Sequence, residues 1–104
     1  MYEYKAKVKR VIDGDTYEMI IDLGFNLDFT VDVRIIGCDA YETYGEEEDK
    51  GDKATKFAED TLLGKELVIN TEYDMTFDRY LAKVFVDGVD FSKLLIKEGH
   101  AVTR

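Results

Sequence analysis

The sequence predicts a mainly β domain, α+β by content, in which five strands form a closed barrel accompanied by two helices. Three observations lead to this prediction. Apolar and polar residues alternate in three successive segments near the start of the chain. A helical pattern follows, and two further alternating segments and a short second helical pattern complete the chain. Three strands, a helix and two strands is the order of a five-stranded Greek-key barrel of the OB type. A strongly twisted open α+β sheet is the alternative on pattern alone.

An acidic break separates the first two expected strands. The first covers residues 4–12, and its apolar face is expected to carry Ala6, Val8 and Ile12. The sequence Asp13-Gly14-Asp15 then interrupts the alternation, because Asp-Gly is a favoured turn dipeptide. Alternation resumes over residues 16–23, which we expect to form the second strand.

Residues 26–35 show the clearest alternation in the chain. Five polar residues alternate with five apolar residues, which are Leu27, Phe29, Val31, Val33 and Ile35. Five alternations in a row predict a half-buried antiparallel strand. Arg34 falls on the polar face of this strand, at the end that leads toward Asp39.

The spacing of apolar residues changes to that of a helix after the acidic stretch. Between Ala54 and Leu62 they recur at intervals of three and four, which predicts an amphipathic helix that plugs one end of the barrel. We expect Asp52 to be its N-cap and Gly64 to follow its last turn. The run from residue 46 to residue 49 is expected to be a solvated loop, because like charges repel one another and stay hydrated.

The last third of the chain supplies the remaining elements. Strands are expected over residues 67–73 and 79–86. The turn dipeptide Asp87-Gly88 leads toward Asp90, the expected N-cap of a short helix over residues 91–98. The full prediction is therefore one helix after the third strand and a short helix after the fifth.

Length and composition limit the classes of protein. A chain of 104 residues predicts one domain over residues 1–104, and we expect a monomer. A single cysteine excludes an internal disulfide framework and a multi-cysteine zinc module. No apolar run approaches the ~20 residues of a membrane span, so no membrane partner is expected. The N-terminus lacks an apolar signal stretch, which predicts a cytoplasmic protein, or a secreted one if the chain is a trimmed mature form.

The net charge is strongly negative but unevenly distributed. The chain has 23 acidic and 14 basic residues, for a formal charge of −9. At first sight this excludes a nucleic-acid partner, because two polyanions repel one another. However, seven acidic residues and one lysine lie between Asp39 and Asp52, so this stretch carries −6 of the total. The charge balance of the whole chain therefore does not exclude a phosphodiester substrate.

Three polar clusters interrupt the apolar strands. Asp13 and Asp15 are two residues apart, so in an extended segment both carboxylates point the same way, although a simple tight turn is the alternative. The second cluster combines Arg34 with Asp39 and Glu42, and the third is Arg79 at the head of the fifth expected strand. Taken singly, Arg34 is equally well explained as a surface residue, and Arg79 is better explained as one.

Together the three clusters contain the parts of a phosphodiester hydrolase. Carboxylate and carbonyl oxygens suit Ca²⁺ or Mg²⁺. A further carboxylate that does not bind the metal can take a proton from water. Two arginines can clamp a phosphate and stabilise the charge that develops on it.

Three motifs resemble those of the staphylococcal-nuclease (thermonuclease) family, which also includes the nuclease-like domains of Tudor-containing proteins. They are Val11-Ile12-Asp13-Gly14-Asp15-Thr16, Val33-Arg34-Ile35-Ile36-Gly37-Cys38-Asp39-Ala40-Tyr41-Glu42-Thr43 and Asp78-Arg79-Tyr80-Leu81-Ala82. Supporting matches lie at residues 51–57, 87–88 and 95–101. The resemblance covers essentially the whole chain, and the ordered set is more specific than any single motif.

The resemblance implies a site for one Ca²⁺. Asp15 and Asp39 would be its carboxylate ligands, and the main-chain carbonyl of Ala40 would be a third ligand. Asp13 would lie behind them and organise bound water.

The resemblance also implies a catalytic set. Glu42 matches the proposed general base, and Arg34 and Arg79 match the pair that clamps the phosphate. The implied activity is an endonuclease that hydrolyses DNA or RNA with calcium by in-line attack of water, with single strands preferred. Tyr41 and Tyr44 flank Glu42 and are the candidates for contacting a base or sugar of the substrate.

The sequence departs from the family pattern at several positions. Ala40-Tyr41 stands where the family usually has Thr-Pro, and Phe77-Asp78 stands where Tyr-Gly is common. Thr76 replaces a lysine, and the chain stops at Arg104, before the usual long C-terminal helix and two nucleotide-packing tyrosines. These departures leave an alternative function: a catalytically weak or inactive OB-type module that binds nucleic acid or a protein.

Overall fold

The computed structural model describes residues 2–72 and 80–104. One candidate site residue, Arg79, lies outside the described residues. Thr76, Phe77 and Asp78, at which the sequence departs from the family pattern, also lie outside the described residues.

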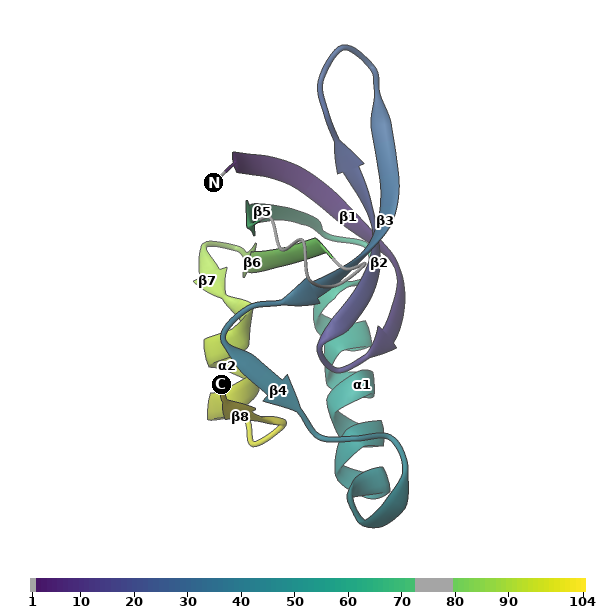
Figure 1. Ribbon diagram of the computed structural model, residues 1–104, viewed down its shortest axis with the longest axis vertical. Helices are drawn as coiled ribbons and strands as arrows, with labels where there is room; N and C mark the ends of the chain where they lie inside the picture. Colours follow the sequence, from purple (N-terminus) through teal and green to yellow (C-terminus); the bar gives the residue numbers. More distant parts are fainter. Residues whose placement is uncertain (1, 73–79) are drawn as a thin grey trace.

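Strands dominate the structure, and two α-helices accompany them (Figure 1). The strands are β1 (Tyr2–Asp13), β2 (Thr16–Asp22), β3 (Asp28–Ile35), β4 (Cys38–Ala40), β5 (Glu66–Glu72), β6 (Tyr80–Val86), β7 (Val89–Asp90) and β8 (Ala101–Thr103). The helices are α1 (Glu48–Leu62) and α2 (Phe91–Lys97), and a 3-10 turn, η1 (Gly45–Glu47), leads into α1. No helix among the described residues is long and apolar enough to cross a membrane.

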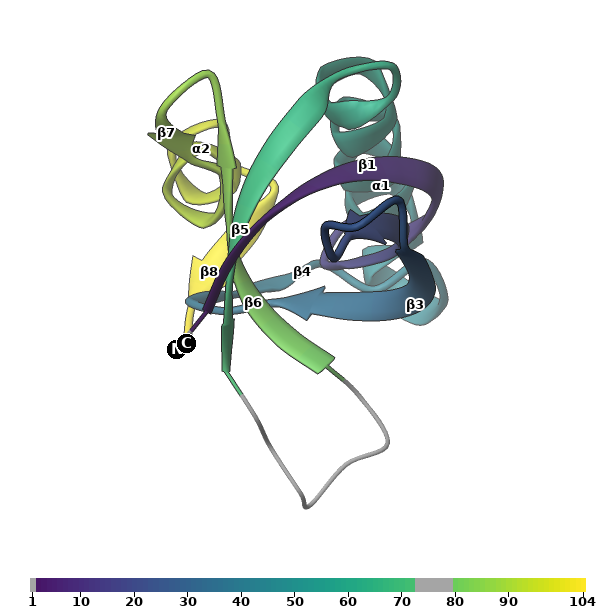
Figure 2. The same cartoon turned by 90° about the horizontal axis from the view of Figure 1, so that it is seen from above.

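Five strands close into a barrel, which confirms the predicted architecture and excludes the open sheet. The strands lie in the order β3-β2-β1-β5-β6, and each neighbouring pair is antiparallel. A parallel pairing closes the barrel, in which residues 33–35 of β3 lie beside residues 80–82 of β6. Figure 2 shows the strands wrapping around one another in this way. The short strands β4 and β8 form a separate antiparallel pair beside the barrel.

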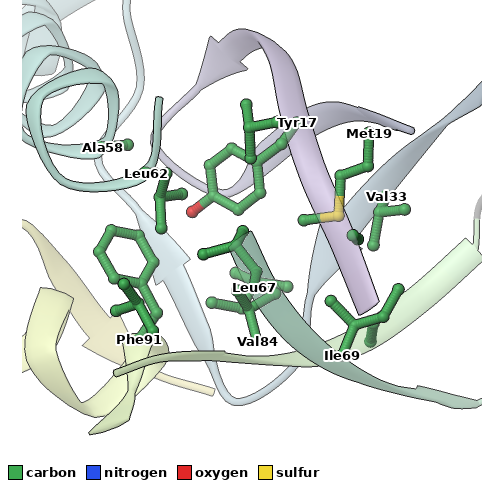
Figure 3. Close-up of a cluster of buried hydrophobic side chains, with 14 of the residues drawn as sticks. Tyr17, Met19, Val33, Ala58, Leu62, Leu67, Ile69, Val84 and Phe91 are labelled. Carbon is green, nitrogen blue, oxygen red and sulfur yellow. The ribbon is translucent and has the colours of Figure 1, made fainter. Parts of the chain in front are cut away.

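The core fills the barrel and extends to the two helices. Tyr17, Met19, Leu67 and Ile69 are fully buried inside it, and Figure 3 shows Ala58 and Leu62 of α1 beside Tyr17. Burial of one such large side chain stabilises the fold by about 1.5–3 kcal/mol. The helix α1 therefore packs against one end of the barrel, as its apolar spacing predicts.

The apolar face of β1 differs from the prediction at one residue. Ile12 is 37% exposed, and its neighbour Val11 is buried instead. The pairing of β1 with β2 shifts by one residue between Val8 and Arg10. One extra residue in a strand reverses which side chains face inward beyond that point.

The apolar face of β3 is buried only in its second half. Val33 and Ile35 are buried, whereas Leu27 and Phe29 are exposed. The reason is that β2 and β3 extend beyond the barrel as a hairpin, and β6 pairs with β3 only at residues 33–35. Figure 1 shows this β2–β3 hairpin projecting at the end of the molecule opposite α1.

The acidic run forms part of a helix instead of a loop. Residues 45–47 form η1, and Glu48 and Asp49 lie in the first turn of α1. Carboxylates in the first turn interact favourably with the positive end of the helix dipole. Because the helix starts at Glu48, the expected N-cap Asp52 lies inside it, and that prediction was wrong.

Other helix termini agree with the sequence. Gly64 follows the C-cap of α1 in a left-handed conformation, with φ of +80°. Asp90 caps α2, because its Oδ1 accepts hydrogen bonds from the N–H and the hydroxyl of Ser92 at 3.0 and 2.8 Å. The two helices meet where the ring of Phe57 stacks on that of Phe91, with centroids 6.0 Å apart.

Candidate functional site

A polar cavity of about 470 Å³ lies where β1 turns into β2 and β3 ends. Its lining contains four carboxylates and one guanidinium group. The residues are Ile12, Asp13, Asp15, Thr16, Asp32, Arg34 and Glu42. The structure therefore brings Asp13, Asp15, Arg34 and Glu42 together as the sequence predicts, and it adds Asp32.

The turn between β1 and β2 is held in place by local hydrogen bonds. Asp13 Oδ1 accepts the N–H of Asp15 at 3.1 Å, and the buried hydroxyl of Tyr17 donates to the carbonyl of Gly14. A Cβ at Gly14 would lie 2.7 Å from that of Ala40 and 3.0 Å from that of Ala54. The turn thus packs closely on β4 and α1, and the same residues form a tight turn and direct carboxylates into the cavity.

Arg34 is the centre of the charge network. Its side chain is only 11% exposed, and Nη1 donates to the carbonyls of Ile35 at 2.9 Å and Cys38 at 3.4 Å. Nη2 donates to Asp15 Oδ2 at 3.2 Å and also to Asp39 Oδ1. A charged group taken out of water needs such partners, because an unpaired one is costly.

The three candidate metal ligands are neighbours around this arginine. Asp15 and Asp39 both contact Nη2 of Arg34, and Asp15 Oδ2 also accepts the N–H of Ala40 at 3.0 Å. The carboxylate of Asp39 is 47% exposed, although the site cavity is not lined by it. One contact on Asp39 was not predicted, an ion pair at 3.6 Å with Arg104. It arises because β8 places the residue after Thr103 beside the start of β4.

Glu42 reaches the cavity from the segment between β4 and η1. A Cβ at Gly51 would lie 1.9 Å from the carbonyl oxygen of Glu42, so the first turns of α1 touch the main chain there. Only glycine permits this approach. The only sequence signal for this role was the family match at residues 51–57.

The two tyrosines expected to contact substrate lie beside the cavity and do not line it. The ring of Tyr41 lies under the ammonium of Lys50, whose Nζ is 5.0 Å from the ring centroid. The N–H of Tyr41 donates to the carbonyl of His100 at 3.3 Å. Tyr44 is largely exposed, so its role in substrate contact stays a prediction.

Burial and the neighbouring carboxylate of Asp15 together raise the pKa of Asp13. Burial is the largest cause that raises the pKa of Asp13 to about 6, followed by the hydrogen bond and the negative charge of Asp15. The nearby thiol of Cys38 is buried, and its pKa rises to about 12, also mainly through burial. Cys38 is therefore a neutral side chain of the core at physiological pH.

The family model described as staphylococcal nuclease homologue matches residues 32–104. The match covers more than two thirds of the chain. The chain belongs to this family. The matched range contains Arg34, Asp39 and Glu42, and it begins after Asp13 and Asp15. A comparison with curated proteins gives no match.

The donor set of this nuclease homologue fits a hard cation in its chemistry. Asp15 and Asp39 supply carboxylate oxygens, and the main chain of Ala40 lies against Asp15. Within residues 2–72 and 80–104, no group of three or more His, Cys, Asp or Glu side chains is arranged to hold a metal. An ion at this place would therefore need the carbonyl of Ala40 and water as further ligands, which is common for Ca²⁺.

Proposed function

We propose that the chain is a calcium-dependent phosphodiesterase, an endonuclease that hydrolyses DNA or RNA and prefers single strands. The observation that supports this proposal is the cavity in which Asp15, Glu42 and Arg34 converge, in a member of the nuclease homologue family. A carboxylate ligand, a carboxylate base and a guanidinium group are the parts that hydrolysis of a phosphodiester needs.

The residues that would hold the ion are Asp15, Asp39 and the carbonyl of Ala40, with Asp13 behind them as an acceptor for bound water. Ca²⁺ at this place supplies positive charge for the phosphate oxygens and offsets the repulsion among the carboxylates. The pKa of Asp13 is raised mainly by burial and also by the neighbouring carboxylate of Asp15, which is consistent with such repulsion. Such a site suits a chain whose acidic charge would otherwise repel the substrate.

Glu42 and Arg34 would carry out the chemistry. Glu42 accepts a proton from a water molecule while the water oxygen forms a bond to phosphorus. The bond from phosphorus to the opposite ester oxygen breaks, and that oxygen leaves and takes a proton from solvent. The cleaved strand then ends in a 3′-phosphate. Arg34 donates to the phosphate oxygens, and by this proposal Arg79 supplies the second guanidinium group.

Arg34 links the binding of the cation to the binding of the substrate. Its Nη2 is occupied by Asp15 and Asp39, so it must exchange these partners before it can bind a phosphate. A cation that binds the two carboxylates competes for the same oxygens and thereby frees the guanidinium group. We therefore expect substrate to bind weakly in the absence of calcium.

The test is cleavage of labelled single-stranded DNA and RNA with calcium and with a chelator. Removing one donor that stabilises transition-state charge costs about 10²–10³ in rate, so Arg34→Ala and Glu42→Gln should each lose most of the activity. The matched controls are Arg10→Ala and Glu59→Gln, because both side chains are exposed and neither residue lines the cavity. Cleavage in chelator, or full activity in both site variants, would contradict the proposal.

One observation favours the alternative of a binding module with little or no turnover. Arg34 and Arg104 already neutralise Asp15 and Asp39, so the site is compensated without a cation. Binding of an oligonucleotide at micromolar concentration with no cleavage and no effect of calcium would establish this alternative.

A further inference from the structure

An apolar groove lies at the end of the barrel where β1 begins and the β2–β3 hairpin leaves the barrel. Its volume is about 740 Å³, and among the described residues that line it only Glu72 is charged. Four aromatic rings dominate it in two pairs. Tyr2 and Tyr4 have centroids 6.4 Å apart, and Phe29 meets Tyr80 edge to face at 5.7 Å.

The tip of the β2–β3 hairpin presents an aromatic side chain beside this groove. Phe25 is 98% exposed, and its φ of +54° lies in the left-handed region, as does that of Asn26 at +59°. The turn is ordered by two main-chain hydrogen bonds between Leu23 and Leu27 and between Leu27 and Gly24, at 2.8 and 2.9 Å. A bulky residue in this conformation costs about 1–2 kcal/mol, which glycine or asparagine would largely avoid.

The side chain of Phe25 therefore contributes nothing to the stability of the isolated chain. It buries no surface there, and it adopts a backbone conformation that disfavours it. A residue that is unfavourable for the folded monomer and points into solvent indicates a contact with another molecule.

We propose that this end of the barrel is a self-association surface, in which Phe25 of one copy inserts into the aromatic groove of a second copy and the second copy does the same in return. Leu23 and Phe29 line the groove and also flank the hairpin tip, so tip and groove belong to one continuous surface. A surface that carries both a projection and its receptacle can form a closed two-fold pair.

The exposed apolar area supports a second copy as the occupant. Leu23, Phe25, Leu27, Phe29, Tyr2 and Tyr80 are all exposed at this end. With about 150–250 Å² for a whole aromatic side chain, their exposed parts amount to roughly 700 Å² per copy. A standard stable interface buries about 800 Å² per partner, so the patch suffices for a pair of modest affinity.

The charge of the chain indicates how this pair should respond to salt. Each copy carries −9, so two copies repel one another, whereas the described lining of the groove is mostly uncharged. Salt screens the repulsion and leaves the apolar contact intact. Association should therefore strengthen with salt, which is the opposite of the behaviour expected for binding a nucleic acid.

The pair replaces the expectation of a monomer and does not depend on the proposed nuclease activity. Tyr2 and Tyr4 lie at the start of β1, whereas Asp13 lies at its end, so the groove and the polar cavity occupy opposite ends of one strand. Asp15, Arg34 and Glu42 line the polar cavity, and none of them lines the groove.

The first test is sedimentation velocity of the full chain from low micromolar to near-millimolar concentration, at low and high salt. The wild type should convert from monomer to dimer, and Phe25→Asn should weaken that dimer at least tenfold. Val89→Asn is the matched control, because Val89 is also exposed but lies in β7, outside the patch. A wild type that stays monomeric throughout, or a Phe25→Asn variant that pairs as tightly, would overturn the proposal.

The second test distinguishes insertion of Phe25 into the groove from nonspecific association of exposed apolar residues. Phe25→Asn keeps the groove and loses the projection, whereas Tyr2→Ser keeps the projection and alters the groove. An equimolar mixture of the two variants should form more dimer than either variant alone, because one of the two reciprocal contacts is restored. No gain on mixing, or growth beyond the dimer in the wild type, would contradict a closed two-fold pair.

Discussion

The two ends of the barrel are built from the same strands, yet their side chains lie in opposite environments. At one end Arg34 and its carboxylates are partly or largely withdrawn from water, and each has partners inside the molecule. At the other end aromatic rings and the tip residue Phe25 face solvent. The strand β1 runs from the exposed aromatic end to the polar end, so one element serves both.

The difference shows how strongly the folding of a single chain depends on the side chains at each end. A charge withdrawn from water requires several partners at once, and at the polar end these come from the β1–β2 turn, β3 and β4. Exposed apolar residues require no partner for the chain to fold. Substitutions should therefore be costly at the polar end and nearly free at the groove end when the chain is monomeric.

The largest effect is expected at the contact between α1 and the Glu42 main chain. Gly51→Ala gains up to about 1 kcal/mol of helix propensity. It also places a Cβ against the carbonyl oxygen of Glu42, and such overpacking costs about 1–3 kcal/mol or more. We expect a net loss of about 2 kcal/mol in the free energy of unfolding, measured by urea denaturation.

The control for this variant is Asp52→Ala one residue along the same helix. Because Asp52 lies inside α1 and is exposed, its removal should change stability by less than about 0.5 kcal/mol. An N-cap would cost about 1 kcal/mol instead, and equal effects of the two variants would contradict the close contact at Gly51.

The second largest effect is expected at the centre of the charge network. Arg34→Met keeps most of the aliphatic stem and leaves Asp15 and Asp39 without their shared partner. Breaking a buried pair costs about 3–5 kcal/mol, and the partial exposure of Asp39 reduces this to about 1–2 kcal/mol. Thermal unfolding in chelator measures the loss.

Calcium should reduce the difference in melting temperature between the two proteins. In Arg34→Met a cation no longer competes with Arg34 for the carboxylates of Asp15 and Asp39, so calcium should raise its melting temperature more than that of the wild type. Arg10→Met serves as the control, since Arg10 is exposed and pairs only with Glu18, at 3.8 Å, among the described contacts. An equal or smaller calcium effect in Arg34→Met would show that Asp15 and Asp39 are not its ligands.

A smaller effect is expected from Asp13 and depends on pH. The pKa of Asp13 is raised to about 6 in the folded chain, from an ordinary value of 3.8. The folded state therefore holds a proton that the unfolded state loses, so this contribution to stability is complete below about pH 4 and is lost as pH rises through 6. Asp13→Asn should remove that dependence, so its stability relative to wild type should rise between these values.

The measurement for Asp13 is thermal unfolding of both proteins in chelator at several pH values between 4 and 7. Asp13 shares its cavity with Asp15, Asp32, Glu42 and Arg34, so the difference between the two proteins is the quantity that reports on Asp13 alone. Parallel curves for wild type and variant would contradict the raised pKa.

The smallest effect is expected at the groove end. In dilute solution Phe25→Asn should raise the free energy of unfolding by up to about 1 kcal/mol, because asparagine tolerates a positive φ better than phenylalanine does. Denaturation at a concentration at which the chain is monomeric provides the measurement. A loss of more than about 1 kcal/mol would show that Phe25 stabilises the single chain and would remove the contrast between the two ends.

Local patterns were sufficient for most of the fold. Alternation identified the five barrel strands, the spacing of apolar residues identified the first helix, and the turn and N-cap residues identified the second. The errors came from interactions between residues that are farther apart in the chain than these local patterns extend. The bulge in β1 exchanged Ile12 for Val11, and the length of the hairpin exposed Leu27 and Phe29. Both depend on how a strand pairs with its neighbour.

The site was predicted in part for the same reason. The motifs identified Asp13, Asp15, Arg34, Asp39 and Glu42, because chemically distinctive residues interrupt apolar strands. They did not identify Asp32, Arg104 or the contact at Gly51. Asp32 is one of four polar residues that alternate along β3, and it reaches the cavity because it shares a face of the strand with Arg34, two residues away. Arg104 reaches Asp39 through the pairing of β4 with β8.

The sequence by itself determined the order of elements, the family and the chemical types of the site residues, because these depend on spacing and on side-chain identity. The tertiary structure decided which charges neutralise one another and which apolar residues stay in contact with water. Those outcomes depend on distances between residues that are far apart in the chain. The family motifs therefore mark the polar end of the barrel, and only the folded chain reveals that aromatic side chains are exposed at its other end.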